Sequence, residues 1–383
     1  MSISIGVVGK PNAGKSTFFS ALTMADAKIA PFPFTTIEPN RGVAYVRKEC
    51  PHTIKGKQCE PRDSSCVNGT RFIPIQVTDV AGIVPDAHLG KGLGLQFLDD
   101  IRQADALVQV IDASGRSDLE GNACEGCDPS AEVDFLEKEI THWIQGIIER
   151  NWAKVKGRPL SALYDVFASM KLTPAQAEAA AKRLGLPETL NWDEGQKLSF
   201  AEEVRKLKPI FIAANKADSA KPETLKMLSE KFAGRVAFCS AAYELALRKA
   251  AKAGAVEYVP GASSFSVRNA NEEQQKALAK ISDYLKASGG TGVQDALEKV
   301  VNNTLGLIAV YPVEDENKWS DRKGTVLPNV FLMRKNSTPV DLAAHVHTDL
   351  AKNFISAVDA KRHLRIGKDY ILNDGDIIKI ISG

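Results

Sequence analysis

The sequence lacks long hydrophobic runs, a strong charge of one sign and space for an N-terminal targeting peptide. No apolar stretch among its 383 residues approaches the length that spans a bilayer, so we expect no membrane partner. The net charge is only +2, which gives no global field that favours nucleic acid, and we expect no DNA partner. Met1 leads almost directly into an apolar run, which leaves no room for a signal or transit peptide. We therefore expect a cytoplasmic protein with two or three domains.

Cysteine is also scarce, and disulfides are not expected in a reducing compartment. Three of the six cysteines, Cys50, Cys59 and Cys66, share a turn-rich insert with His52 between two expected strands. Three thiolates and an imidazole match a tetrahedral zinc site, which would stabilise an insert too small for its own core. Only the Cys50–His52 spacing is short, unlike common zinc fingers, so free or redox-active thiols are the alternative.

The other three cysteines fit ordinary structural roles. Cys124 and Cys127 follow a strand expected over 106–112, at the opposite end of the sheet from the insert, and their pattern indicates a loop. Cys239 lies in an apolar strand, where a small hydrophobic thiol is typical of a core.

A phosphate-binding loop is the most informative feature that the sequence does contain. The apolar run 3–8 indicates a buried strand, and 17–22 indicates the start of a helix. The pattern G-x-x-x-x-G-K-S between them is specific in such a strand–loop–helix context. Lys15 would reach the β- and γ-phosphates and Ser16 would ligate Mg²⁺, while backbone N–H groups hold the β-phosphate. The loop residues expected to contact the nucleotide are Gly9, Pro11, Asn12, Ala13, Gly14, Lys15, Ser16 and Thr17.

A second motif selects the base. Asn215, Lys216 and Asp218 form N-K-x-D after an apolar strand expected over 209–214. The Asp218 carboxylate would accept from N1–H and the exocyclic amine of guanine, and adenine, which lacks that donor pair, would leave it desolvated and unpaired. Asn215 would tie this loop to the phosphate loop, and the Lys216 stem would cover one face of the base. Backbone N–H groups near guanine O6 are expected from Ser240, Ala241 and Ala242.

Two further segments predict a metal and γ-phosphate site. Asp79 ends a strand expected over 72–78 and would hold Mg²⁺ through a water, and the Gly82 N–H would sense the γ-phosphate. Upstream, a loop without helical or strand period contains Thr35 and Thr36, one of which should close over Mg²⁺. The pieces stand in the order that a guanine-nucleotide site requires.

With these motifs the chain resembles the Obg-related translation-factor GTPases, most closely the archaeal and eukaryotic branch of the YchF subgroup. The resemblance implies that Thr36 is the magnesium threonine and that Asn12 helps to hold a potassium ion. Bacterial-type YchF proteins have a degraded base motif and prefer ATP, whereas this chain retains 215–218, which favours GTP. Further segments that carry the resemblance are 33–40, 79–85, 90–94 and 372–376.

The order of expected elements predicts an α/β, Ras-like P-loop domain over 1–130 and 206–243, with a mostly parallel sheet and helices on both faces. Two helical blocks, 131–205 and 244–305, are expected to form one helical subdomain packed against it. Their tryptophans are expected as core anchors rather than base-stacking platforms, at Trp143, Trp152 and Trp192.

The C-terminal segment 306–383 resembles the TGS domain, a small α+β, ubiquitin-like fold. Within it we expect a helix near 351–358 and a strand at 371–372. The basic run 361–365 indicates either an RNA contact or a solvated helix end.

The resemblance implies a translation-factor-class molecular switch that is a monomer, hydrolyses GTP to GDP and phosphate, and meets RNA or the ribosome. The residues expected to act in hydrolysis are Lys15, Thr36, Gly82 and Asn12. Ile83 stands where many small GTPases carry a water-orienting Gln, so a monovalent cation, the backbone or a partner must supply the missing charge. Two alternatives stay open: a nucleotide-gated binding protein with negligible turnover, and an ATPase like bacterial YchF.

Overall fold

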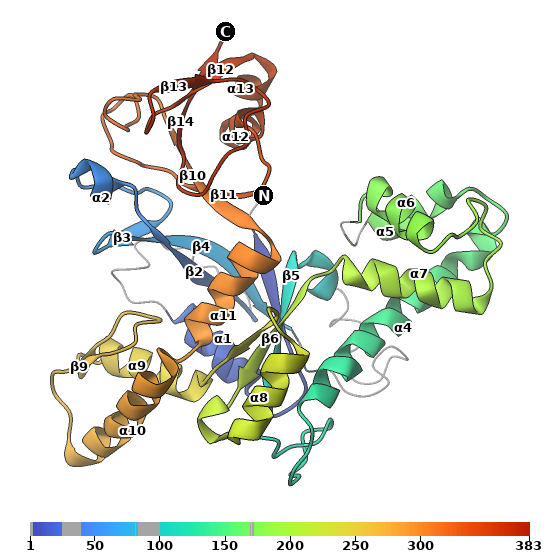
Figure 1. The fold of residues 1–383 in the computed structure, drawn as a ribbon, viewed down its shortest axis with the longest axis horizontal. Coiled ribbons are helices and arrows are strands. Elements are labelled where there is room, and N and C mark those ends of the chain that lie inside the picture. The colour runs from blue at the N-terminus through green and yellow to red at the C-terminus, as the bar shows by residue number, and fades with distance from the viewer. Residues whose placement is uncertain (1–2, 25–39, 81, 83–99, 169, 171) are drawn as a thin grey trace.

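The computed structural model describes residues 3–24, 40–80, 82, 100–168, 170 and 172–383 (Figure 1). It confirms the expected α/β architecture, since the centre of the molecule is a seven-stranded, mostly parallel sheet. The strands of this sheet are β1 (Ser4–Val8), β2 (Arg41–Glu49), β3 (Ser65–Val67), β4 (Thr70–Asp79), β5 (Ala106–Asp112), β6 (Ile210–Asn215) and β7 (Val236–Phe238).

The sheet has the order β2–β4–β1–β5–β6–β7, and β3 also pairs with β4. Strands β4, β1, β5, β6 and β7 run parallel, whereas β2 and β3 run antiparallel to β4. Every residue of β5 and β6 is buried, as expected for apolar strands that helices cover on both faces. The loops after the parallel strands therefore meet at one edge of the sheet, where ligands bind in such folds.

Helices cover both faces of this sheet. On one face α1 (Lys15–Thr23) packs with α11 (Val293–Lys299) against the apolar side chains of β1, β4 and β5. On the other face α4 (Ser130–Val155) and α8 (Pro222–Lys231) bury Val133 and Leu228. Between β6 and α8 lies a short 3₁₀ turn, η3 (Ala217–Ser219).

One helical subdomain follows β5 and lies to the right in Figure 1. Its core contains Trp143, Trp192 and Phe200, and the Trp192 and Phe200 ring centroids are 4.8 Å apart. Trp152 packs against the same core, so the expected role of the tryptophans is confirmed. Besides α4, the subdomain contains η2 (Leu160–Leu163), α5 (Tyr164–Ala168), α6 (Pro174–Arg183) and α7 (Glu194–Lys206).

The second helical block does not join the first, so the expectation of one helical subdomain is wrong. Helices α9 (Ala241–Lys252) and α10 (Glu272–Ser288) surround a separate core on the other side of the sheet, with the ribbon β8 (Val256–Glu257) and β9 (Ser266–Val267). Helix α11 and the π-helical turn η4 (Val300–Thr304) bury their valines under the central sheet instead. An apolar face packs on the nearest uncovered sheet face, and the sheet separates the two blocks.

The C-terminal domain is a five-stranded sheet in the order β11–β10–β14–β12–β13, at the top of Figure 1. The expected helix near 351–358 is largely wrong, because 354–359 pairs with β14 as a strand. Residues 371–372 are not a strand. The basic run 361–365 is not a helix end either, because 361–363 form a turn and 364–365 begin β13. The elements are β10 (Leu307–Val313), β11 (Phe331–Arg334), α12 (Pro339–Val346), α13 (Thr348–Lys352), β12 (Phe354–Asp359), β13 (Leu364–Ile366) and β14 (Ile377–Ser382).

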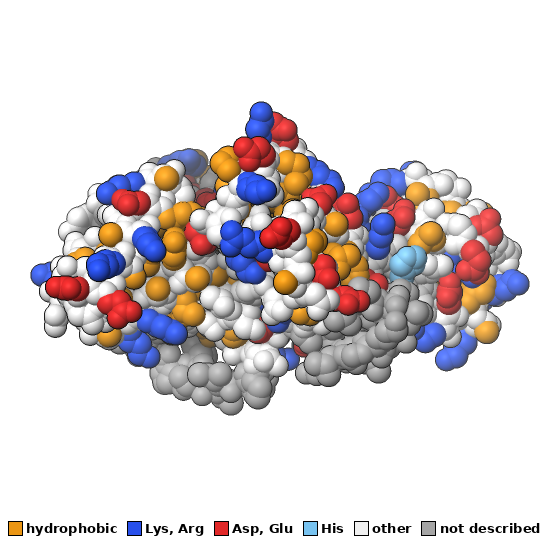
Figure 2. Space-filling model, turned by 90° about the horizontal axis from the view of Figure 1, so that it is seen from below, with side chains coloured by type: hydrophobic (Ala, Val, Ile, Leu, Met, Phe, Trp, Pro, Cys, Tyr) orange, Lys and Arg blue, Asp and Glu red, His pale blue; other side chains and the backbone are white. Residues whose placement is uncertain are grey.

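The insert between β2 and β4 carries α2 (His52–Lys55) and β3, and the C-terminal domain packs on it (Figure 1). This contact lies at the start of β4, whereas the loops that follow the parallel strands lie at its end. Figure 2 shows Lys, Arg, Asp and Glu side chains interspersed over the face in view, without one dominant sign. Of the helices that the structure describes, none combines the length and apolarity needed to cross a membrane.

Candidate nucleotide-binding site

The phosphate loop connects β1 to α1, as the motif predicts. Gly14 caps α1 with φ 90°, and a β-carbon there would lie 2.3 Å from Asn215 Nδ2, so only glycine fits. Asn12 also has left-handed backbone geometry, with φ 61°. The loop backbone thus curls beneath the start of α1, where unpaired N–H groups and the helix dipole favour a phosphate.

Lys15, Ser16 and Asp79 meet at the start of α1. Lys15 Nζ lies 2.6 Å from Asp79 Oδ1, and the Ser16 hydroxyl lies 3.3 Å from Asp79 Oδ2. The parallel register places Val7 of β1 beside Asp79 of β4, which brings the end of β4 to the phosphate loop. The Lys15 and Asp79 side chains are each 13% exposed, so solvent and a ligand reach them. A hydroxyl and a carboxylate are oxygen donors of the kind that Mg²⁺ prefers.

The γ-phosphate segments are described only in part. Gly82 is exposed and lies beside the phosphate loop, since a β-carbon on it would be 3.9 Å from the Gly9 carbonyl oxygen. The expected magnesium threonine Thr36, its neighbour Thr35 and the segment 83–94 lie outside the described residues.

Asn215 joins three loops at the end of β6. Its amide nitrogen donates to the Ala13 carbonyl over 2.9 Å, and its amide oxygen accepts from the Ala241 N–H over 3.0 Å. The side chain is 3% exposed, so both bonds are shielded from water. The expected link between base loop and phosphate loop is therefore present, and it extends to the start of α9.

Lys216 strengthens the same connection. Its backbone is left-handed, with φ 59°, and its ammonium donates to the Asn12 carbonyl and to Asp112 Oδ2, each over 2.7 Å. Burial alone would raise the pKa of Asp112, but hydrogen bonds from Lys216, Ser114 and Ser117 outweigh it and lower that pKa. The long Lys216 stem is thereby held across the gap between the two loops.

The other residues that are expected to contact the base line the same edge. Asp218 is exposed in η3, two residues after Lys216, and its carboxylate is open to a ligand. Ser240 and Ala241 are buried at the start of α9, and Ala242 is exposed. These positions are the ones that the motif order predicts for a base next to a bound phosphate.

A buried ionic network beneath the phosphate loop was not predicted. Lys10 is only 2% exposed, and its ammonium donates to the Ser117 and Asp118 carbonyls over 3.1 and 2.8 Å. Glu132 lies 3.5 Å from the same ammonium. Burial raises the pKa of Glu132 to about 8, although Lys10 acts in the opposite direction. Two features of the sequence could have indicated this network: Asp112 is a carboxylate at the end of an apolar strand, and Lys10 lies inside the phosphate-loop motif. No local sequence pattern indicates that Glu132 takes part.

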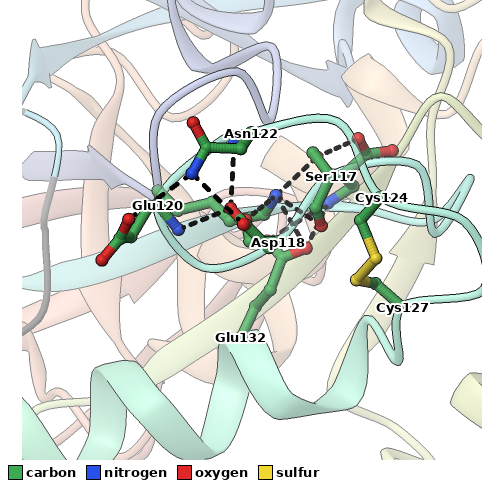
Figure 3. Close-up of a disulfide and its surroundings, with 9 residues drawn as sticks. Ser117, Asp118, Glu120, Asn122, Cys124, Cys127 and Glu132 are labelled. Atoms are coloured by element: carbon green, nitrogen blue, oxygen red, sulfur yellow. Dashed lines mark hydrogen bonds and ion pairs between the residues drawn. A yellow bond between two sulfur atoms is a disulfide. The ribbon is translucent and has the colours of Figure 1, made fainter.

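The loop 113–128 packs against the phosphate loop, since a β-carbon on Gly121 would lie 2.9 Å from Pro11 Cβ. Figure 3 shows the part of this loop that surrounds Cys124 and Cys127. Asn12 Nδ2 donates to the Gly121 carbonyl over 2.9 Å. Contrary to the expectation of a plain loop with free thiols, Cys124 and Cys127 form a disulfide, with 6.1 Å between their Cα atoms. The Cys127 N–H donates to Gly115 O and the Cys124 N–H to Arg116 O, which holds both residues within the range for a disulfide.

A second candidate site lies in the β2–β4 insert. The ligand atoms of Cys50, His52, Cys59 and Cys66 all lie within 4.8 Å of one another. Cys239, by contrast, is buried in the central core, as expected, and burial raises the pKa of its thiol.

Three protein families match successive parts of the chain. Residues 4–148 match the family described as 50S ribosome-binding GTPase, and 213–315 match the Obg-like GTPase YGR210-like, G4 motif-containing domain. Residues 322–382 match the TGS domain. The described phosphate loop, the base loop and the C-terminal sheet lie within these three ranges.

Similar proteins span the whole chain. An uncharacterized GTP-binding protein of Methanocaldococcus jannaschii is 45% identical, with 99% of this chain and 98% of the relative covered. The crystal structure of a GTP-binding protein from Pyrococcus horikoshii covers 100% of both chains with a TM-score of 0.80 at 40% identity. A ribosome-binding ATPase YchF of Bacillus subtilis is 28% identical, with 99% and 98% covered. The chain therefore belongs to the Obg-like GTPases of the archaeal and eukaryotic YGR210 type, which are related to YchF and end in a TGS domain.

Proposed function

We propose that this GTP-binding protein hydrolyses GTP to GDP and phosphate. One observation carries the proposal: Asn215 bonds to the Ala13 carbonyl and the Ala241 N–H, which fixes the base loop beside the phosphate loop. A nucleotide whose phosphates meet Lys15 would then present its base to Asp218. The Asp218 carboxylate matches the two donors of guanine and would be unpaired against adenine.

The chain's own residues bind and orient the phosphates. Loop N–H groups and the N-terminus of α1 would hold the β-phosphate, and the Lys15 ammonium would neutralise charge that develops between the β- and γ-phosphates. Ser16, Asp79 and Thr36 would hold Mg²⁺, which when bound supplies charge neutralisation on the same oxygens. The N–H of Gly82, beside Gly9, would contact the γ-phosphate.

A monovalent cation would supply positive charge at the phosphates of a chain that has no water-orienting glutamine. The Asn12 amide nitrogen donates a hydrogen bond to the Gly121 carbonyl oxygen. The amide oxygen of Asn12 therefore points away from Gly121. That oxygen, with oxygens of the phosphates, would hold K⁺, and the cation would supply the charge that an arginine finger supplies elsewhere.

We further propose that the GTP-bound protein associates with the ribosome or its RNA as a cytoplasmic monomer. Two observations support this: the chain has a TGS domain, and its distant YchF relatives are named ribosome-binding ATPases. The insert–TGS contact lies at the far end of β4 from Asp79, so the TGS domain leaves the nucleotide edge uncovered for exchange.

Multiple-turnover phosphate release with GTP, with and without ribosomes, tests the proposal. We expect slow release by the protein alone and co-sedimentation with ribosomes in a GTP analogue but not in GDP. Binding without turnover in either condition would favour a nucleotide-gated binding protein, which the absence of Gln at position 83 also fits. Turnover of ATP at the rate of GTP would favour an ATPase like the distant relatives.

A further inference from the structure

The insert between β2 and β4 brings together four side chains with the composition of a metal site. Cys50 directly follows β2, His52 begins α2, Cys59 lies in the following loop, and Cys66 lies in β3. Cys50 Sγ is 3.7 Å from Cys59 Sγ, and Cys66 Sγ is 3.6 Å from His52 Nδ1. In a tetrahedral zinc site with zinc–sulfur bonds of about 2.3 Å, the ligand atoms are about 3.5–3.8 Å apart.

We propose that Cys50, His52, Cys59 and Cys66 bind a structural zinc ion, and that this ion fastens the insert of the GTPase domain to the TGS domain. Three thiolates and one imidazole in a closed arrangement suit zinc, whereas magnesium and calcium require oxygen ligands. Exposure of Cys50, Cys59 and His52 is 0%, 4% and 8%, and Cys66 is partly exposed, so three of the four ligands are buried as in a structural site. A Cys50–Cys59 disulfide would need sulfurs about 2.05 Å apart and would leave Cys66 and His52 without a role.

A buried arginine gives independent support through charge. Arg71 is 0% exposed, its Nη2 donates to the Leu327 carbonyl over 2.7 Å, and its Nε and Nη1 have no hydrogen-bond partner. No carboxylate in the described part of the chain lies within ion-pair distance of it. The Asp63 carboxylate acts on the same charge only from beyond ion-pair distance. A buried charge with no counter-charge in direct contact is unfavourable. Cys66 of β3 lies opposite Arg71 of β4 in the antiparallel register, and Cys59 is close enough to interact with the Arg71 charge. Zinc with three thiolates carries a net charge of −1 and would compensate the guanidinium there.

The cluster lies where the two domains pack. Cys50 and Cys59 share one apolar core with Tyr311, Trp319 and Leu327 of the C-terminal segment. The Glu60 N–H donates to Val326 O over 2.9 Å, and the Arg62 N–H donates to Pro328 O over 2.8 Å, so the loop after Cys59 runs along the segment before β11. The side chains of Lys55 and Arg62 add bonds to Asn317 and Asp321. A metal that fixes the insert therefore also fixes this contact.

The metal itself is tested on the full chain purified without a tag or chelator. Elemental analysis should give about one zinc per chain, and Cys59→Ser should remove most of it. Cys239→Ser makes the same change at a buried cysteine outside the cluster and should keep the zinc. Replacement of zinc by Co²⁺ in the wild type should give sulfur-to-cobalt charge-transfer bands and the visible bands of tetrahedral cobalt.

The cobalt measurement keeps the proposal falsifiable if Cys59→Ser does not fold. Metal-free wild-type protein whose Cys50, Cys59 and Cys66 thiols are alkylated under native conditions would overturn the zinc site. So would a cobalt spectrum without sulfur-to-metal bands, or loss of zinc from Cys239→Ser to the same extent as from Cys59→Ser.

The role at the domain contact is tested by hydrogen exchange. Removal of zinc with a chelator should increase exchange at the Glu60, Arg62 and Leu327 amides at least tenfold, while the amides of β5 keep their protection. Equal exchange of the three amides with and without zinc would overturn the fastening role.

Discussion

The two ends of β4 differ in how open their polar groups are. At one end Asp79 meets Lys15, and both side chains are 13% exposed. At the other end, about 30 Å away for a strand of this length, Arg71 and Cys50 have no exposed surface. One strand thus joins a site open to a ligand and a site closed to it.

The difference follows from what each site must do. A site that exchanges a nucleotide must let solvent reach its cations and oxygen donors, and these side chains keep part of their hydration. A structural site gains most when it is closed, because its ligands then have no competing water. The open end is formed by loops that follow the strands. The closed end lies in a hydrophobic core to which two domains contribute side chains.

The largest effect should come from removing a positive charge at the open end. Lys15→Ala removes the ammonium next to Asp79, and we expect GTP turnover to fall by at least about 100- to 1000-fold, as on loss of a transition-state charge stabiliser. Steady-state phosphate release measures the change. Zinc content should not change, because the cluster lies at the far end of β4.

Lys286→Ala is the control for that variant. Lys286 is exposed on α10 and pairs only loosely with Asp283, at 3.4 Å, so turnover should stay at the wild-type rate. Unchanged turnover in Lys15→Ala would show that the activity belongs to a contaminant.

A smaller effect should test whether a potassium ion takes part in hydrolysis at the open end. GTP hydrolysis should be severalfold faster in potassium than in sodium at equal ionic strength, because sodium is too small for ligands spaced for potassium. Asn12→Ala removes the amide oxygen and should abolish the difference. Asn122→Ala alters another amide of the neighbouring loop 113–128 and should retain it. Equal wild-type rates in both salts would instead favour a group supplied by a partner.

The smallest effect concerns Glu132, a buried carboxyl group near the open end. Burial raises the pKa of Glu132 to about 8, against about 4.3 in an unfolded chain, so between these values the folded state binds more protons. The Glu132 contribution to the free energy of unfolding therefore falls as pH rises from 5 to 8. Glu132→Gln should make the melting temperature less dependent on pH by a few degrees over this window.

Glu149→Gln, an exposed change on the same helix, provides the comparison for Glu132. It should leave the pH dependence of the melting temperature as in the wild type. If Glu132→Gln and the wild type lose stability in parallel from pH 5 to pH 8, the titration of Glu132 is assigned wrongly.

The sequence reveals the ligand-facing residues of the open end, but not the buried contact beneath them. Lys15 and Ser16 lie in one contiguous motif, and strand periodicity places Asp79 and Asn215 at strand ends. The Lys10–Glu132 contact joins residues 122 positions apart, and no local pattern predicts such a pair. The fold shows the same limit. A helix is expected near 351–358, but most of that segment belongs to β12, which pairs with β14 because tertiary contacts override local propensity.

For the cysteines, the sequence predicts one grouping and misses another. Residue type was enough to group Cys50, Cys59 and Cys66 with His52, and the structure brings them together. Neither spacing nor compartment predicted the Cys124–Cys127 disulfide, which depends on the backbone bonds of that loop to Gly115 and Arg116.

Nucleotide competition in wild type and Asp218→Asn tests the central claim most directly. The wild type should bind GTP at least about 100-fold more tightly than ATP, because adenine leaves the Asp218 carboxylate unpaired. The variant presents an amide in place of one acceptor, so its preference should move from GTP toward XTP. Equal affinity of the wild type for ATP and GTP, or a variant that keeps the wild-type preference, would contradict the assignment of this site to guanine.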